Sequence, residues 1–266
     1  MRELAGKVVV VTGAGSGIGR ALAHAFAAKQ AQVVVADVDR GRAALVVEEL
    51  PGAVAVCADV TDPLEMERLR DEVLDRFGAV HVLCNNAGIA HASPILRSTA
   101  ADWRRVIDVN LLGVVHGVLA FAPVLVAQGR GHIVNTASMA GFVAGADLAS
   151  YDASKHAVVA LTENLWRELQ GTGVGVSLLA PAFVDTPLFA NATGDTATRE
   201  TFAATTAQWG IDAGLVAATT VAAVIADRFW VFTHPGTVQM TAIKSAYAIA
   251  DLPPSDPFRA PELAES

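Results

Sequence analysis

The chain has 266 residues, of which 53% are hydrophobic and 17% charged, and its formal net charge is −8. This composition can fill a substantial core and leaves no basic surplus for nucleic acid or an anionic membrane, so neither partner is expected. Cys57 and Cys84 each lie in an apolar run, which predicts buried free thiols and no disulfide framework, and the first seven residues do not form a secretory signal, so we expect a cytoplasmic protein.

Short β-branched segments alternate along the chain with segments of helical length. The predicted strands occupy residues 8–11, 31–36, 53–57, 80–84, 132–135 and 174–179. The predicted helices occupy residues 18–29, 40–50, 63–77, 101–128 and 150–170. Most of the strands are apolar throughout, as strands covered on both faces are. The alternation predicts an α/β fold over residues 1–250, a single-domain doubly wound parallel sheet between two layers of helices.

The most apolar stretch of the sequence covers residues 111–127. It contains His116 and Pro123, and it is shorter than the roughly 20 apolar residues that a membrane span requires. We therefore interpret it as a buried helix.

The first strand runs into a glycine-rich turn, TGAGSGIG at residues 12–19, which opens the first helix. Gly13 permits a tight turn, Gly17 lets the backbone approach a pyrophosphate, and Gly19 lets the helix pack on the strand. The helix N-terminus adds free N–H groups and the positive end of a dipole. The turn therefore predicts a dinucleotide site.

Asp37 ends the second strand, 18 residues beyond Gly19. A carboxylate there can accept hydrogen bonds from the adenosine ribose and would repel a 2′-phosphate, which favours NAD over NADP. Alternatively, Asp37 only caps the turn before the next helix. Arg40 is the nearest cation that could bind a phosphorylated ribose instead.

Tyr151 and Lys155 lie four residues apart in the predicted helix over residues 150–170, and therefore on one helical face. A nearby cation favours the phenolate, and lowering the phenol pKa from about 10 by about two to three units corresponds to roughly 3–4 kcal/mol. Tyr151 could then exchange a proton with a substrate hydroxyl. Ser138 follows the strand over residues 132–135, where it could polarise the substrate oxygen or only form a turn.

Two later regions depart from the alternation. Residues 182–212 follow the sixth strand, where a ligand crevice opens, and we expect a mobile substrate lid there. Large apolar side chains in this region and after Ser138 suggest an apolar or cyclic substrate, or only lid packing. These candidate substrate residues are Met139, Phe142, Phe189, Phe202 and Trp209. The Pro-rich tail over residues 251–266 is expected to be disordered or to lie against a partner subunit.

Five elements of this chain resemble the short-chain dehydrogenase/reductase family in their order and spacing. They are TGAGSGIG at residues 12–19, NNAG at residues 85–88, Asn110, Ser138 and Tyr151-xxx-Lys155. The resemblance covers about residues 6–190. It implies a Rossmann-fold oxidoreductase that uses NAD to interconvert a secondary alcohol and its ketone.

The resemblance also assigns roles to individual residues. It implies that Tyr151 is the acid/base, that Lys155 lowers its pKa and holds the nicotinamide ribose, and that Ser138 orients the substrate. Asn110 would anchor a water that links Lys155 to solvent. The implied cofactor contacts are Gly13, Ser16, Gly17, Ile18, Gly19, Asp37, Asp59, Val60, Asn86, Ala87, Gly88, Tyr151, Lys155, Pro181, Val184 and Thr186.

The chain also departs from the pattern of the family. Where the family has Pro-Gly after the sixth strand, this chain has Pro181-Ala182, and a backbone that needs a positive φ would be strained there. The Gly-Gly that ends the last strand is replaced by FWVFTHP at residues 229–235, which argues against close kinship with the acyl-carrier-protein ketoreductases.

Assembly and alternative functions remain open at this point. The helices over residues 101–128 and 150–170 resemble those that pair across subunits in the family, so we expect a homotetramer, with a dimer as the alternative. An NADP-dependent carbonyl reductase and a non-catalytic dinucleotide-binding sensor are the alternative functions. The histidines form no ligand-like cluster with Cys or carboxylate partners, so no metal site is expected.

Overall fold

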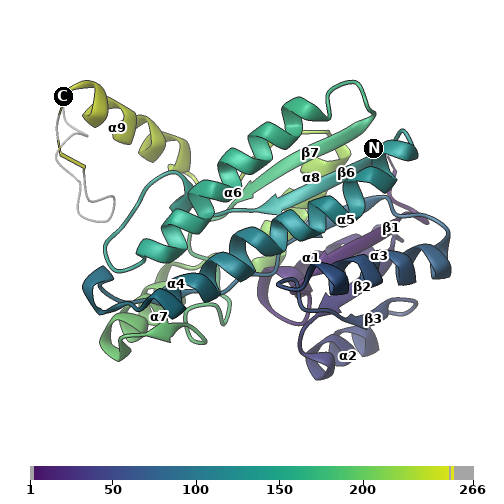
Figure 1. Cartoon of the computed structure of the whole chain (residues 1–266), viewed down its shortest axis with the longest axis horizontal. Helices are drawn as coiled ribbons and strands as arrows, with labels where there is room; N and C mark the ends of the chain where they lie inside the picture. Colours follow the sequence, from purple (N-terminus) through teal and green to yellow (C-terminus); the bar gives the residue numbers. More distant parts are fainter. Residues whose placement is uncertain (1–2, 252, 255–266) are drawn as a thin grey trace.

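The computed structural model describes residues 3–251, 253 and 254, and a parallel sheet lies at its centre (Figure 1). Seven strands of the described chain follow one another in the spatial order β3-β2-β1-β4-β6-β7-β9. Their bounds are β1 (Val8–Thr12), β2 (Gln32–Asp37), β3 (Val54–Cys57), β4 (Val82–Asn85), β6 (Gly131–Thr136), β7 (Val174–Ala180) and β9 (Trp230–Phe232). The strand order reverses between β1 and β4, where a crevice opens at the carboxyl ends of the strands.

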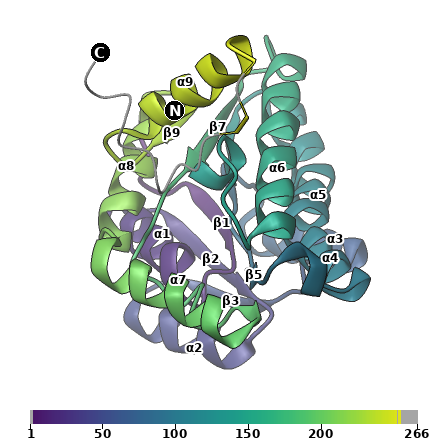
Figure 2. The ribbon, with the colours of Figure 1, turned by 90° about the vertical axis from the view of Figure 1, so that its left-hand side faces the viewer.

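Helices cover both faces of this sheet (Figure 2). One face carries α1 (Gly17–Ala27), α2 (Arg40–Glu49) and α8 (Ala213–Ile225). The other carries α3 (Pro63–Phe77), α5 (Gly113–Ala127) and α6 (Ala149–Glu168). Successive β1 side chains alternate between the two cores, with Val9 and Val11 in one and Val8 and Val10 in the other. This two-sided burial explains the continuous apolar runs, and the predicted doubly wound fold is confirmed.

The predicted helix over residues 101–128 is interrupted in the structure. It consists of α4 (Ala100–Ile107), a π-helical turn at Asp108–Leu112 and α5. Residues 100–127 are long and apolar enough to cross a membrane by those two criteria alone. However, Phe121 and Leu125 of α5 are fully buried in the core against the sheet. One side of the segment thus packs in the core as expected, whereas Leu112, Leu119 and Val126 on it are exposed.

The region predicted as a lid has regular structure of its own. The two-residue strand β8 (Thr193–Gly194) pairs with β5 (His91–Ala92), and α7 (Thr196–Trp209) follows it. The buried His91 bonds Thr193 Oγ1 through Nδ1 at 3.0 Å, and Arg97 forms an ion pair with Asp195 at 3.1 Å. These contacts attach the segment to β5 and to the turn that follows it, in a two-stranded sheet separate from the central one.

The C-terminal helix α9 (Thr237–Ile249) extends away from the sheet (Figure 1). Its Lys244 donates a 2.7 Å hydrogen bond from Nζ to the carbonyl oxygen of Phe142. Most of the tail predicted over residues 251–266 lies outside the described residues.

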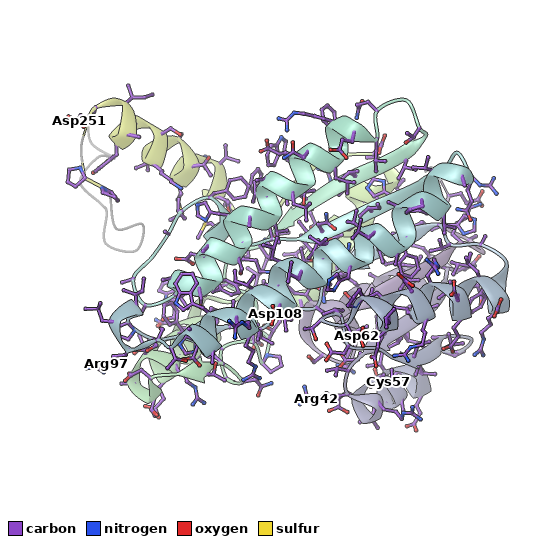
Figure 3. The ribbon with its side chains drawn as sticks, in the orientation of Figure 1. Arg42, Cys57, Asp62, Arg97, Asp108 and Asp251 are labelled. Atoms are coloured by element: carbon purple, nitrogen blue, oxygen red, sulfur yellow. The ribbon has the colours of Figure 1, made fainter. Side chains whose placement is uncertain are left out.

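The prediction for the two cysteines is half wrong. Cys84 is buried, and burial raises the pKa of its thiol. Cys57 is exposed (Figure 3), because β3 is the edge strand of the sheet and its side chains alternate between buried and exposed. A short apolar run does not show whether a strand lies inside the sheet or at its edge.

Candidate active site

A cavity of about 840 Å³ opens at the carboxyl ends of the strands. Loops that follow β1, β2, β3, β4, β6 and β7 line it, together with the first turns of α1 and α6. It includes the point between β1 and β4 where the strand order reverses. This is where open α/β sheets bind their ligands.

The glycine-rich turn forms the floor at one end of the cavity. Gly13 has a φ of +63°, and a Cβ built on it would lie 2.7 Å from the Cα of Ala87. Gly19 lies outside the lining, and its own Cβ would meet the carbonyl oxygen of Gly13, so it serves helix packing. Ser16, Gly17 and Ile18, at the start of α1, face the cavity. A backbone cradle at a helix N-terminus, with no room for side chains, fits a pyrophosphate.

Asp37 lines the same end of the cavity, and its carboxylate also stabilises the turns at Gly15 and Asp39. Its carboxylate accepts hydrogen bonds from the N–H of Gly15 at 2.8 Å and the N–H of Asp39 at 2.9 Å. Each carboxylate oxygen keeps a further lone pair for a ribose hydroxyl, so the two interpretations of Asp37 are compatible. Among the cations of the lining, Arg42 rather than Arg40 lies beside Asp37, because a Cβ built on Gly15 would meet the side chains of both. Arg42 pairs with Asp39 at 3.2 Å.

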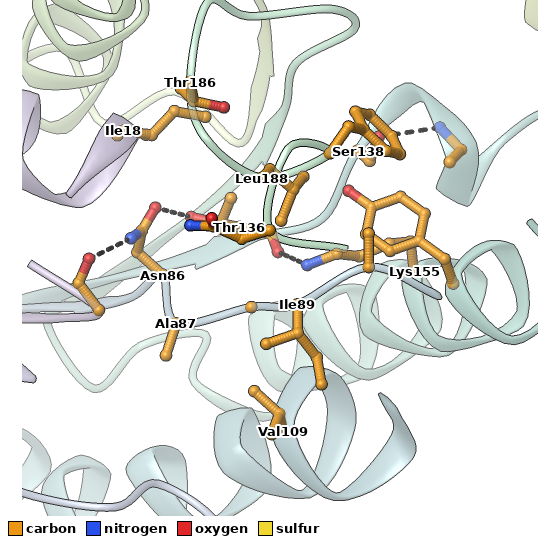
Figure 4. Close-up of a pocket in the computed structure, with 18 of the residues that line it drawn as sticks. Ile18, Asn86, Ala87, Ile89, Val109, Thr136, Ser138, Lys155, Thr186 and Leu188 are labelled. Atoms are coloured by element: carbon orange, nitrogen blue, oxygen red, sulfur yellow. Dashed lines mark hydrogen bonds between the residues drawn. The ribbon is translucent and has the colours of Figure 1, made fainter. Parts of the chain in front are cut away.

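The NNAG segment is fastened to β1 and β6. Thr12 Oγ1 accepts hydrogen bonds from the N–H groups of Asn86 (3.0 Å) and Ala87 (3.2 Å). Thr136 Oγ1 donates to Asn86 Oδ1 at 3.4 Å (Figure 4). These bonds set Asn86, Ala87 and Gly88 along the middle of the cavity.

The loop after β3 lines the cavity with Asp59 and Val60. His116 of α5 bonds the Val60 carbonyl oxygen through Nδ1 at 2.8 Å, and Gly113 packs against the Val60 side chain. These contacts fix Asp59 and Val60 at the edge of the cavity, where the family resemblance would place the adenine.

Ser138, Tyr151 and Lys155 come together in the inner part of the cavity, and all three are buried. The Lys155 ammonium lies 5.7 Å from the centre of the Tyr151 ring and donates a 2.9 Å bond to the Thr136 carbonyl oxygen (Figure 4). Ser138 Oγ donates to the Pro181 carbonyl oxygen at 3.2 Å. The i, i+4 spacing thus places the phenol and the ammonium as predicted from the sequence.

Burial shifts the pKa values of this pair in opposite directions. It raises the pKa of Tyr151 to about 12, although a hydrogen bond with Ser138 opposes the rise. It lowers the pKa of Lys155 to about 8. Both shifts penalise the charged forms, so a phenolate needs the Lys155 ammonium and further positive charge beside it.

Asn110 lies behind the lining, on the π-helical turn. Its amide group donates to the Ile89 carbonyl oxygen (3.0 Å) and Ser154 Oγ (3.1 Å), and its Oδ1 accepts from the Ile89 N–H (2.9 Å). A Cβ on Gly88 would lie 3.4 Å from Asn110 Oδ1 and 3.6 Å from Lys155 Nζ. Asn110 and Lys155 therefore flank the same backbone segment.

The loop after β7 borders the cavity through Pro181, Ala182, Val184 and Thr186. Ala182 is not among the described residues with a positive φ, so the strain expected there is absent. The Ala182 N–H donates to His234 Nδ1 at 3.1 Å, and His234 Nε2 bonds the Phe183 carbonyl oxygen at 2.7 Å.

Sequence reasoning did not find His234, because its partners lie about 50 residues earlier. Its place directly after the last strand, where the family has glycines, is the signal that could have found it.

The candidate substrate residues divide into two groups. Met139 and Phe189 line the cavity, and the Phe189 ring centre lies 6.2 Å from that of Tyr151. Phe202 lies outside the lining and stacks on Phe189 at 5.2 Å.

Phe142 and Trp209 also lie outside the lining. The short 3₁₀ turn at Met139–Gly141 reverses the chain, so that Phe142 packs against Phe232 of β9 at 5.4 Å. Trp209 is 67% exposed at the end of α7. Sequence reasoning missed other apolar side chains that line the cavity, among them Val143, Leu148 and Phe183.

Within residues 3–251, 253 and 254, no cluster of three or more His, Cys, Asp or Glu side chains could hold a metal ion.

Comparison with known proteins places this site in a family. The family model for short chain dehydrogenases matches residues 7–197. The chain is 42% identical to a 1-deoxy-11-beta-hydroxypentalenate dehydrogenase of Streptomyces exfoliatus over 235 residues, which cover 86% of this chain and 83% of the relative. It is 36% identical to a 3-oxoacyl-[acyl-carrier-protein] reductase of Thermotoga maritima, over 70% of this chain and 77% of that protein.

A solved structure agrees with these sequence matches. The crystal structure of a short-chain dehydrogenase/reductase from Burkholderia phymatum in complex with NAD superposes with a TM-score of 0.91 at 38% identity. The match covers 96% of this chain and 99% of that one. With its glycine-rich turn, its paired Tyr151 and Lys155 and these similarities, the chain belongs to the short-chain dehydrogenase/reductase family of oxidoreductases.

Proposed function

We propose that this protein uses NAD(H) to interconvert a secondary alcohol and its ketone. The observation that carries the proposal is the meeting of Ser138, Tyr151 and Lys155 in the cavity that the glycine-rich turn also lines. The cradle around Gly13 and the carboxylate of Asp37 fit the pyrophosphate and the adenosine ribose of a dinucleotide.

Side chains of the protein would transfer the proton of the reaction. NAD bound in this cavity would supply the hydride acceptor for alcohol oxidation. Ser138 would hold the substrate oxygen, and the Tyr151 phenolate would take the hydroxyl proton or return it in the reductive direction. Lys155 would favour the phenolate through its charge. Asn110, next to Gly88, would hold a water that relays protons from Lys155 to solvent.

Asp37 is the basis for proposing NAD rather than NADP. A carboxylate at this position repels a 2′-phosphate, and the related Burkholderia phymatum protein was crystallised with NAD. NADP is the alternative, because Arg42 lines the cavity nearby. Relative activity with NAD and NADP tests this choice directly.

We propose an apolar, cyclic alcohol as the substrate class. Met139, Leu148, Phe183 and Phe189 provide apolar walls near Tyr151. The Streptomyces exfoliatus relative is named as the dehydrogenase of a hydroxypentalenate, which supports an alcohol as the substrate. Residues 182–212 would act as the lid that covers it, with Phe189 at its inner surface.

We further propose a cytoplasmic homotetramer, with a dimer as the alternative. Along α5 and the π-helical turn before it, Leu112, Leu119 and Val126 are exposed, which suits helix pairing between subunits. Light scattering of the purified protein distinguishes the two assemblies.

The decisive experiment compares wild type and Tyr151→Phe for oxidation of a panel of secondary alcohols. We expect the substitution to remove turnover and to leave NADH binding largely intact, because it deletes the proton-transfer group alone. Activity retained within a few-fold would contradict the assignment of Tyr151. Tight NADH binding by wild type, without turnover of any alcohol or ketone, would instead favour the non-catalytic sensor.

A further inference from the structure

The mechanism leaves one buried acidic group of the cavity without a role. Asp152 follows Tyr151 in the first turn of α6, lines the cavity, and is only 4% exposed. Burial raises the pKa of its carboxyl group to about 7, because little solvent is left to stabilise the charge. A buried carboxyl group in an apolar wall calls for a polar partner.

The protein satisfies only one of the two carboxyl oxygens. Asp152 Oδ2 accepts a 3.0 Å hydrogen bond from the Gly145 N–H. Oδ1 has no hydrogen-bond partner in the described part of the chain. In the described part of the chain, a side-chain polar atom is both fully enclosed and without a partner at Asn85 Oδ1, Ser150 Oγ and Arg199 Nε. Asp152 Oδ1 is not among these atoms, so it is not fully enclosed. Oδ1 thus keeps some accessible surface, and Asp152 is one of the residues that line the cavity.

The surroundings of Asp152 define the chemistry that Oδ1 can accept. Of the lining residues, Gly145 and Leu148 contact Asp152, through the Gly145 N–H and the Leu148 carbonyl oxygen, and neither offers a side-chain donor. On the α9 side, the Lys244 ammonium bonds the Phe142 carbonyl oxygen at 2.7 Å and His156 Nε2 at 3.0 Å, and its charge lowers the Asp152 pKa. On α6, Tyr151 and Lys155 face the same cavity.

These groups discriminate between classes of ligand. The positive charges of Lys244 and Lys155 disfavour an additional ammonium group, and the carboxyl group of Asp152 disfavours a second carboxylate. A neutral hydroxyl group can donate to Oδ1 without meeting either repulsion. A hydroxyl is therefore the group that best matches this part of the wall.

We propose that Asp152 is a substrate-recognition residue, whose free Oδ1 accepts a hydrogen bond from a second hydroxyl group of the substrate. The substrate class is then an apolar, cyclic secondary alcohol that carries another hydroxyl away from the reacting carbon. This inference rests on the proposed alcohol dehydrogenase function and specifies its substrate.

The test measures kcat/KM with NAD for matched pairs of alcohols. Cyclohexanol is compared with the cyclohexanediols, and decalin alcohols are compared with their analogues that carry one further hydroxyl. A hydrogen bond to a buried carboxylate is expected to favour the hydroxylated member by about 10-fold or more in at least one pair. Asp152→Ala is expected to bring that ratio to within about 2-fold of one, because the acceptor is gone.

Two further variants separate recognition from folding. Asp152→Asn keeps the size of the side chain and an acceptor for the Gly145 N–H, but it places an NH2 donor where Oδ1 was, so it should lower the preference by removing the acceptor. Asp147→Asn makes the same change in the neighbouring loop, outside the lining, and should keep the wild-type ratio.

The outcomes distinguish the two proposals. An unchanged ratio in both Asp152 variants would overturn the recognition role, and so would a wild type that oxidises the simple alcohols and prefers no hydroxylated analogue. Absence of turnover with every alcohol and ketone would overturn the proposed function and this inference with it.

Discussion

The charge of Lys155 should control the pH at which this enzyme works. The Lys155 ammonium lies 5.7 Å from the centre of the Tyr151 ring. For two unit charges about 6 Å apart, an effective dielectric constant of about 20 gives an attraction of about 3 kcal/mol. This corresponds to about two pKa units. Since burial, partly opposed by the hydrogen bond with Ser138, raises the Tyr151 pKa to about 12, the enzyme depends on this attraction and on the positive charge of the oxidised nicotinamide.

Lys155→Met tests the size of this electrostatic attraction, because methionine replaces the ammonium with an apolar side chain of similar length. Alcohol oxidation needs the phenolate, so kcat rises with pH as Tyr151 ionises. We expect the rise in kcat to move up by about two pH units in the variant, and kcat near pH 7 to fall by about 100-fold. Measuring kcat at saturating NAD separates this effect from any loss of cofactor affinity.

A surface substitution provides the matched control. Lys29→Met removes a lysine charge from an exposed position and should leave the pH profile unchanged. A Lys155→Met profile with the wild-type midpoint, or with a midpoint at lower pH, would refute the electrostatic argument.

Two histidines give further predictions: His132 on the stability of the fold and His234 on cofactor binding. His132 is 1% exposed, and burial lowers its pKa to about 4, so the unfolded chain takes up a proton first as the pH falls. The contribution of His132 to the free energy of unfolding should therefore fall by roughly 3 kcal/mol between about pH 6.5 and pH 4. Urea titrations of wild type and His132→Gln measure this contribution, because the other titrating groups are common to both proteins. His234→Ala removes the contacts with the Ala182 N–H and the Phe183 carbonyl oxygen. Fluorescence titration should show NADH binding weakened by about 10-fold, with partial recovery in His234→Gln, whereas unchanged affinity would show that His234 does not position the loop.

The fold and the reacting groups could be predicted because their signals are local. The alternation of apolar strands and helices predicted the sheet, since each apolar run lies within one element. The same holds for Tyr151 and Lys155, whose four-residue spacing within one helix sets their common direction. The glycine-rich turn is also contiguous, so its contact with the N-terminus of α1 follows from the sequence.

The sequence did not predict features that depend on the ends or edges of elements. Phe142 was assigned to the substrate side, but a short 3₁₀ turn directs it to β9. Cys57 was expected to be buried, but its strand became the edge of the sheet. The interruption of the helix at Asn110 has no proline or glycine of its own to mark it.

The sequence by itself thus determined the layers, the dinucleotide turn and the phenol–ammonium pair, because each depends on residues within one short stretch. Only the tertiary structure decided which side chains border the cavity. The contacts of His234 and the free Oδ1 of Asp152 arise from the packing of separate segments, and periodicity along a single chain does not encode how those segments meet.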